Sequence, residues 1–293
     1  MKKSRQKVNI GYLYVLPTFL VVGFVMLFPL LYNISLSFFE KTIYSKSWSF
    51  VGINQYKELL GSATFHGALM NTLIWTFFSV LFQFGIGFLC AMVISQDRVK
   101  HKTLLRCLIM LPWVLPSIIG SLTWKWMYHS DYGIINALLV HLGIIDSGIP
   151  WTGSKNTALL SAIIVNTWKM FPLVLLYIEA ILQSVSRELK EAAVVDGARG
   201  LQIFRVVTWP HISPTCKSVI LLLTIWTLNA FTFIFILTGG GPGTASQVLS
   251  MFIYKEAFQN YNFGMAATAS TILFLIVSVF ATIYIIFTSR GDE

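Results

Sequence analysis

Long apolar runs separated by short polar segments dominate the chain. The runs cover residues 11–39, 69–95, 104–128, 157–183, 217–238 and 264–288. Each is long enough for a helix of about 20 residues, which crosses about 30 Å of hydrocarbon. Hydrocarbon offers no partner to unpaired backbone groups, so the runs predict about six membrane-spanning helices. A β-barrel is excluded, because its strands would alternate strictly between apolar and polar positions.

The composition agrees with an all-α integral membrane protein. Of the 293 residues, 56% are hydrophobic and 11% are charged, and the mean hydropathy is +0.72. A soluble domain carries about 25% charged residues, so this chain cannot cover a surface with charge. The first run follows a basic stretch, as in a signal peptide, but no A-x-A-like cleavage site follows it. We therefore expect it to be retained as a helix.

The basic residues indicate the topology. If the N-terminus is cytoplasmic, 14 of the 21 Lys and Arg residues fall on the inner side and five on the outer side. The inner ones are Lys2, Lys3, Arg5, Lys7, Arg98, Lys100, Lys102, Arg106, Arg187, Lys190, Arg199, Arg205, Lys217 and Arg290. The outer ones are Lys41, Lys46, Lys57, Lys155 and Lys255. The positive-inside rule places both termini in the cytoplasm, so the net charge of +9 is a topology signal and not a nucleic-acid footprint.

The inner segment 184–216 is too charged to span but carries helix signals. Ser186 can cap a helix start, and Glu188 lies in the first turn, where the helix dipole favours an anion. Gly197 is a suitable stop. The residues expected on the apolar sides of two short helices are Leu189, Ala192 and Ala193, then Leu201, Phe204 and Val207, with the second helix ending before Pro210. The segment is either a structured helix–turn–helix or a solvated connector.

No catalytic or metal-binding pattern is present. The sequence contains no G-x-x-x-x-G-K-[ST], H-E-x-x-H, C-x-x-C or G-x-S-x-G. The histidines are scattered over different loops: His66, His101, His129, His141 and His211. Cys90, Cys107 and Cys216 fall in spans or on the inner side, so we expect no disulfide. The pattern indicates neither an enzyme nor a bound metal.

Lys125, Lys169 and Glu179 fall well inside the predicted spans. Lys169 is twelve residues past Thr157, about 18 Å along a helix and so near the midplane. A charge there is expensive, which makes it a candidate for the transport pathway; the alternatives are a pair with Glu179 or a side chain that extends to the surface. Glu179 is expected at the cytoplasmic interface, and Lys125, between two tryptophans, is expected to be an interfacial anchor. Small residues spaced for close helix contact are Gly264, Ala266, Ala267 and Ser270.

The inner segment resembles the EAA loop of binding-protein-dependent ABC importer permeases. That loop reads E-A-A, three residues, G, nine residues, an aliphatic residue and L-P. The matching positions are Glu191-Ala192-Ala193, Asp196-Gly197-Ala198, Val207 and Pro210, with Trp209 where Leu is usual. Further matches, in family order, are Phe50–Tyr56, Asn71-Thr72, Leu111 to Trp126, Gly133 with Asn136, Asn166-Thr167-Trp168 with Pro172, and Thr238–Pro242, which is typical of the sugar-importer branch.

The resemblance implies a type I importer transmembrane domain with a cytoplasmic coupling helix. Residues 1–68 would hold the N-terminal tail, first helix and outer loop, 69–288 the transmembrane domain with coupling segment 184–216, and 289–293 a cytoplasmic tail. The implied partners are a second homologous permease, an ATPase dimer, an extracytoplasmic solute-binding protein, a saccharide substrate and membrane lipid, in a prokaryotic cytoplasmic membrane. ATP and Mg would be bound by the ATPase and no cofactor by this chain.

Two sets of site residues follow from the same resemblance. The residues that would dock on the ATPase are Glu191, Ala192, Ala193, Asp196, Gly197 and Ala198. Those matching the substrate pocket of maltose-type relatives are Trp113, Ser117, Asn166, Lys169, Met170, Leu173, Leu223 and Thr227. The aromatic face, hydroxyls and amide among them suit a sugar, whereas Lys169, Met170, Leu173 and Leu223 depart from the maltose pattern.

The favoured function is a permease subunit that moves a sugar, oligosaccharide or related polyol by alternating access. One alternative is an ABC permease for a non-sugar solute. A secondary transporter would show paired acids at mid-membrane or an inverted repeat with broken helices, and neither is evident in the sequence. A receptor or scaffold without transport is disfavoured by the coupling segment.

Overall fold

The computed structural model describes residues 10–44, 48–96 and 98–289. The chain divides into two compact units: one comprises residues 1–61 and 253–272, and the other comprises 62–252 and 273–293. Among the described residues, five helices are long and apolar enough to cross a membrane, or up to six if one bent pair counts as a single span. This confirms the predicted all-helical membrane fold.

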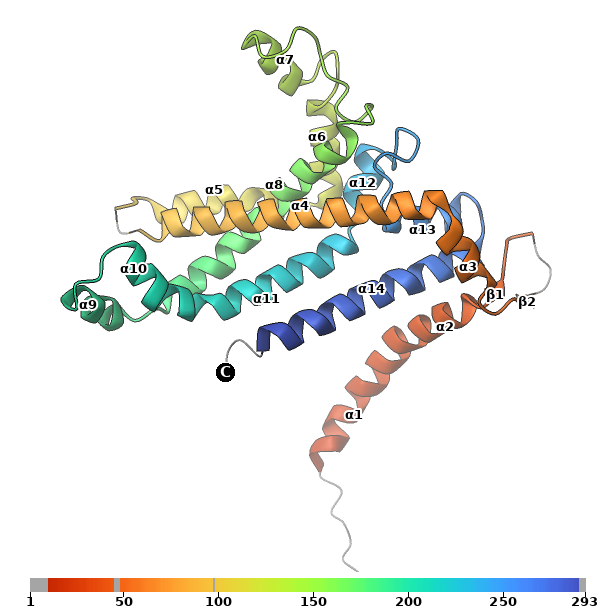
Figure 1. The fold of residues 1–293 in the computed structure, drawn as a ribbon, viewed down its shortest axis with the longest axis horizontal. Coiled ribbons are helices and arrows are strands. Elements are labelled where there is room, and N and C mark those ends of the chain that lie inside the picture. Colours follow the sequence, from red (N-terminus) through yellow and green to blue (C-terminus); the bar gives the residue numbers. More distant parts are fainter. Residues whose placement is uncertain (1–9, 45–47, 97, 290–293) are drawn as a thin grey trace, which may run out of the picture. The chain divides into compact units, whose positions relative to one another are not determined.

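The larger unit is built around three long helices, α4 (Ala63–Ile94), α8 (Ala158–Gln183) and α11 (Trp209–Leu228). They run side by side (Figure 1). The central helix is α8, because 61% of its most apolar stretch is buried, against 28% for α4 and 39% for the span that contains α11. The apolar core between the three helices includes Ala91, Val174, Ile178, Val219 and Leu223.

The predicted third span is not one straight helix. It consists of α5 (Lys102–Val114) and α6 (Ser117–Met127), which meet at an angle of 92°. Leu115 is extended, with ψ 139°, and precedes Pro116. A residue before proline is pushed out of the helical region and proline supplies no backbone donor, so the helix breaks here. The expectation of an uninterrupted span over 104–128 is therefore wrong.

The fifth span also differs from its prediction. The turn α10 (Leu201–Ile203), the π-helical turn η2 (Phe204–Thr208) and α11 form one continuous helix that ends at Leu228, not 238. Pro210 lies inside this continuous helix, two residues after the π-helical turn. The prediction that the second short helix of the inner segment ends before Pro210 is therefore wrong.

A further long span and three shorter helices complete this unit. The span is most of α14 (Phe263–Ser289), and the shorter helices are α7 (Ile134–His141), α12 (Thr232–Leu237) and the first part of α13 (Leu249–Phe258). Around α7, the buried amide of Asn136 donates to the carbonyls of His129 and Ile149 and accepts from Trp151 Nε1 at 2.9 Å. These bonds give the segment after α6 a defined structure.

The smaller unit begins with an N-terminal span of α1 (Ile10–Val22), the π-helical turn η1 (Gly23–Leu27) and α2 (Phe28–Leu36). A two-stranded antiparallel sheet follows, in which Phe39 of β1 (Phe39–Glu40) pairs with Phe50 of β2 (Ser49–Phe50). Helix α3 (Asn54–Gly61) comes next.

The start of α14 packs closely within the smaller unit, as its small residues predicted. A Cβ on Gly264 would lie 2.4 Å from the carbonyl oxygen of Phe39, so only glycine fits there. One turn and a half further on, Ser270 Oγ accepts from Asn33 Nδ2 at 2.9 Å and donates to Asn33 Oδ1 at 3.1 Å. This is helix contact by small residues, the interpretation favoured above.

Candidate functional site

The predicted coupling segment begins with helix α9 (Arg187–Val195), whose ends are those the sequence indicated. The Ser186 hydroxyl accepts a hydrogen bond from the backbone N–H of Leu189 at 3.4 Å, and Glu188 lies in the first turn. The helix stops at Gly197, which adopts φ +85°. That left-handed conformation is nearly free of strain for glycine. The segment is therefore structured and not merely a solvated connector.

The six residues proposed to dock on the ATPase lie along α9 and in the turn after it. Glu191, Ala192, Asp196 and Gly197 are exposed, and Ala193 and Ala198 are half-buried. The apolar residues exposed on α9 are Leu189 at 59%, Val194 at 58% and Val195 at 87%. Exposed apolar side chains beside charges, on a helix too short and polar to span, are typical of a protein-binding surface.

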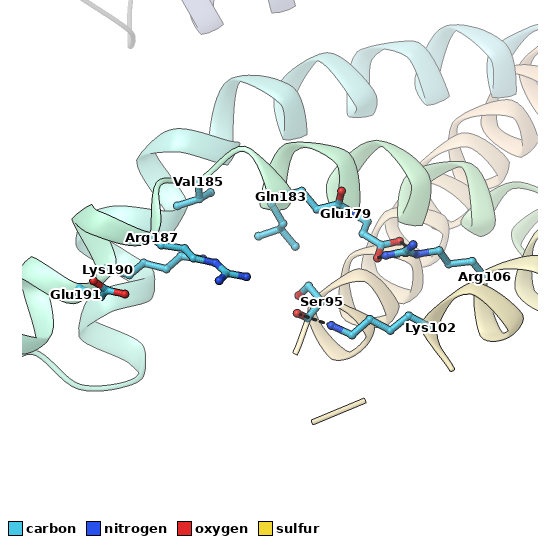
Figure 2. A pocket seen from close by; sticks show the side chains of 10 residues that line it. Ser95, Lys102, Arg106, Glu179, Gln183, Val185, Arg187, Lys190 and Glu191 are labelled. Atoms are coloured by element: carbon cyan, nitrogen blue, oxygen red, sulfur yellow. Dashed lines mark hydrogen bonds and ion pairs between the residues drawn. The ribbon is translucent and has the colours of Figure 1, made fainter. Parts of the chain in front are cut away.

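A cavity of about 700 Å³ separates α9 from the ends of α4, α5 and α8 (Figure 2). Its charged lining residues come from three helices: Lys102, Arg106, Glu179, Arg187, Lys190 and Glu191. Four cations thus face two anions. The Arg187 side chain points from α9 toward Ser95, and the Lys102 side chain reaches Ser95 from the opposite side (Figure 2). We call this the basic cavity.

The anion farthest from α9 is already neutralised within the basic cavity. Arg106 Nε donates to the two carboxylate oxygens of Glu179 at 2.8 and 2.9 Å, and its Nη2 contacts Oε1 as well. Glu179 is only 3% exposed. The suggested pairing of Glu179 with Lys169 is therefore wrong, whereas the expected position of Glu179 at the cytoplasmic interface stays a prediction. Sequence reasoning missed the pair because Arg106 and Glu179 lie 73 positions apart.

Lys169 instead binds the end of the broken helix. Its ammonium donates to the carbonyl of Pro112 at 3.0 Å, to that of Trp113 at 2.8 Å, and also to that of Leu115. The last carbonyls of a helix lack intrahelical partners, and a cation near them is favoured by the dipole. An ammonium has three N–H donors, so these carbonyls use all of them. Lys169 is 6% exposed and has no donor left for a sugar hydroxyl in this arrangement.

A second lysine, Lys125, also binds a helix carbonyl group. Lys125, in the last turn of α6, donates to the carbonyl of Ile236 at 2.9 Å, in the last turn of α12. Its ammonium therefore stabilises an end of α12, a role that the interfacial-anchor interpretation did not foresee.

The eight residues predicted for the substrate pathway divide into two groups. Trp113, at 38% exposed, and the half-buried Ser117 flank the break between α5 and α6. The other six lie inside the chain or against its apolar core: Asn166, Lys169, Met170, Leu173, Leu223 and Thr227. Asn166 contacts α4, where its backbone carbonyl accepts from Gln83 Nε2 at 3.4 Å. Their assignment to the pathway stays a prediction.

Comparison with known proteins places the chain in a family. The profile of the binding-protein-dependent transport system inner membrane components matches residues 83–290. The trehalose/maltose transport system permease protein MalF of Thermococcus litoralis is 31% identical over 97% of this chain and 95% of its own length. A probable ABC transporter permease protein, YurN of Bacillus subtilis, is 32% identical over 97% of both chains.

The fold agrees with that placement. A chain of a bacterial ABC transporter involved in the import of the acidic polysaccharide alginate superposes with a TM-score of 0.84 at 22% identity, covering 97% of this chain and 96% of that one. Members of the matched family cross the inner membrane several times, work with a separate binding protein, and leave ATP binding to a partner ATPase. This chain belongs to that family, the inner membrane permease components of binding-protein-dependent ABC importers.

Proposed function

We propose that this permease moves a sugar, oligosaccharide or related polyol into the cell, together with a second homologous permease. The observation that carries the proposal is α9, a capped and exposed helix at the spacing of an EAA loop, outside the spans. A sugar is supported by the trehalose/maltose permease, which is similar over nearly the whole chain.

In this proposal α9 is the element that the ATPase moves. Glu191 supplies a charge and Ala192 a small side chain at the docking surface, and Val195 adds exposed apolar area. Nucleotide-driven motion of the ATPase would shift α9 and rock the spans between inward and outward states. Such a two-state element, biased from a distant site, is what energetic coupling requires.

The cytoplasmic side is assigned from charge. Of the 14 basic residues expected there, nine fall between Arg98 and Lys217 in the described part of the chain, and four of these line the basic cavity beside α9. In Figure 1, α9, α10 and the start of α5 lie at the same end of α8, with α7 at the other. The remaining five lie outside the described residues: Lys2, Lys3, Arg5, Lys7 and Arg290. This distribution supports cytoplasmic termini.

For the pathway, we propose that the break between α5 and α6 presents Trp113 and Ser117 to the substrate. An indole face and a hydroxyl are the groups that sugars stack on and bond to. Lys169 holds the carbonyl of Trp113 itself, so it acts as a positioning residue for this pair. A membrane protein tolerates irregular backbone where it lines a water-filled cavity or is buried in protein, which supports a pathway at this break.

Uptake by cells tests the substrate class. Cells that lack the chain, and the same cells with it restored, are given labelled trehalose, a neutral oligosaccharide, a polyol phosphate and an amino acid. We expect restoration to recover uptake of a saccharide or polyol only. Recovery of amino acid uptake alone would replace the sugar proposal with a non-sugar permease.

Purification tests the assembly. The tagged chain should copurify with a second, different permease and an ATPase, and uptake should vanish when the ATPase loses its phosphate-binding lysine. A homodimer of this chain that transports without an ATPase would overturn the proposal in favour of a secondary transporter.

A further inference from the structure

The basic cavity holds more positive charge than its own carboxylates match. Arg106 neutralises Glu179. Among the described residues, no carboxylate lies within ion-pair distance of Lys102, Arg187 or Lys190. Lys102 donates to the carbonyl of Ser95 at 3.3 Å, which leaves two of its N–H groups for another acceptor. Like charges on separate helices that line one cavity repel one another, so an anion between them would stabilise the arrangement.

The position of the cavity indicates where that anion comes from. Within two helical turns of Ser95 and Lys102, α4 exposes Leu89 and Val93, and α5 exposes Leu108. Two turns correspond to about 11 Å along a helix. In a chain that spans the membrane, such apolar side chains lie at hydrocarbon depth, which puts the cavity beside them at the depth of lipid headgroups.

We propose that the basic cavity binds the phosphate group of an anionic membrane phospholipid, which thereby links α9 to the end of α5. Its cations would contact the phosphate, and about 700 Å³ is ample for a headgroup. Basic pockets between helices on the cytoplasmic side suit such headgroups. The lipid proposal rests on the proposed function for two points, the choice of the cytoplasmic leaflet and the motion of α9. If α9 moves during transport, its motion would then depend on the bound lipid.

Lipid binding to the purified complex tests the site directly. The complex of this chain with its partners is delipidated and placed in nanodiscs of phosphatidylcholine with increasing phosphatidylglycerol, and the bound phosphatidylglycerol is measured by mass spectrometry. We expect Lys102→Gln and Arg187→Gln each to weaken its binding about fivefold, because each basic residue contributes about that factor. Lys102→Arg keeps the charge and should bind as the wild type does. Lys57→Gln, which changes an exposed lysine of α3 that does not line the cavity, is the matched control.

Three results would overturn the proposal. Unchanged phosphatidylglycerol binding in both charge variants would show that the cavity holds no lipid. Thermal stabilisation of the complex in phosphatidylcholine by inorganic phosphate, with no effect of phosphatidylglycerol, would identify a soluble anion instead. Loss of copurified ATPase at unchanged lipid binding would assign the cations to protein docking. Because the readout is bound lipid and not uptake, a failed sugar proposal would leave this result interpretable.

Discussion

Lys169 and the cations of the basic cavity are both basic groups set among helices, but their charges are satisfied in different ways. Lys169 has its three donors on the carbonyls that end α5, all within the chain. In the cavity only Arg106 has a carboxylate partner among the described residues, whereas Arg187 and Lys190 have none. The ammonium of Lys169 is fully hydrogen-bonded within the chain, whereas the cavity carries positive charge without a carboxylate partner among the described residues.

The presence or absence of partners within the chain distinguishes basic groups with a structural role from basic groups that can bind a ligand. A lysine near the midplane costs at least about 2.5 kcal/mol on insertion scales, so its presence alone suggested a substrate contact. The carbonyls at the helix break account for it without a substrate. The unmatched cations of the cavity have no such explanation within the described residues, and they are therefore the better indication of a bound anion.

The largest expected effect comes from removing the paired cation of the cavity. Arg106→Gln leaves the 4% exposed Glu179 side chain without its partner. Breaking a buried ion pair costs about 3–5 kcal/mol, and we expect about 3 kcal/mol because Arg106 is 35% exposed. Unfolding of the purified protein in mixed micelles by SDS titration measures this loss. Glu179→Gln added to Arg106→Gln should restore most of the stability; no restoration would mean that the pair is not the source.

Removing the lysine at the helix break should have the next largest effect. Lys169→Met removes three hydrogen bonds, and a bond between helices in a membrane contributes about 0.6 kcal/mol, so we expect a loss of about 2 kcal/mol. Lys169→Gln keeps two N–H donors and should lose about a third as much. Uptake should fall with stability in both variants. Wild-type stability of Lys169→Met together with abolished uptake would return Lys169 to the substrate site.

The smallest effect is expected at Lys125. Lys125→Met removes one bond from an exposed side chain to the carbonyl of Ile236, so the loss should be about 0.6 kcal/mol. The same SDS titration applies, with Lys155→Met as a control for removing a basic residue outside the spans. A loss as large as that of Lys169→Met would show that the two lysines hold equally important helix ends.

Local signals predicted the helix ends of the coupling segment correctly. The Ser186 cap and the Gly197 stop depend on residues within one turn, so they are readable from sequence. The apolar runs likewise located four of the six predicted spans, because hydrocarbon sets their length. The break after Val114 was missed because average hydropathy ignores backbone geometry, although Leu115-Pro116 is a readable signal for it.

The partners of the charged residues could not be predicted. Arg106 and Glu179 meet through the packing of α5 on α8, and Lys169 binds carbonyl groups, which every residue carries and no sequence pattern marks. The suggested Lys169–Glu179 pair relied on nearness along one helix. Their ten-residue separation is nearly three turns, about 15 Å, too far for an ion pair.

Coupled ATP hydrolysis and uptake in proteoliposomes test the role of α9 most directly. Glu191→Lys reverses the docking charge, and Ala192→Leu adds bulk at an exposed helical position. Ala192→Leu is a cleaner steric test than Gly197→Leu, since a leucine at φ +85° would itself strain the backbone. Glu58→Lys, the same charge change on an exposed residue of α3, is the control.

We predict that both α9 variants insert and fold but lose uptake at least about tenfold, equivalent to about 1.4 kcal/mol of coupling, while the control transports normally. Wild-type uptake by both α9 variants would contradict the assignment of this helix as the coupling element.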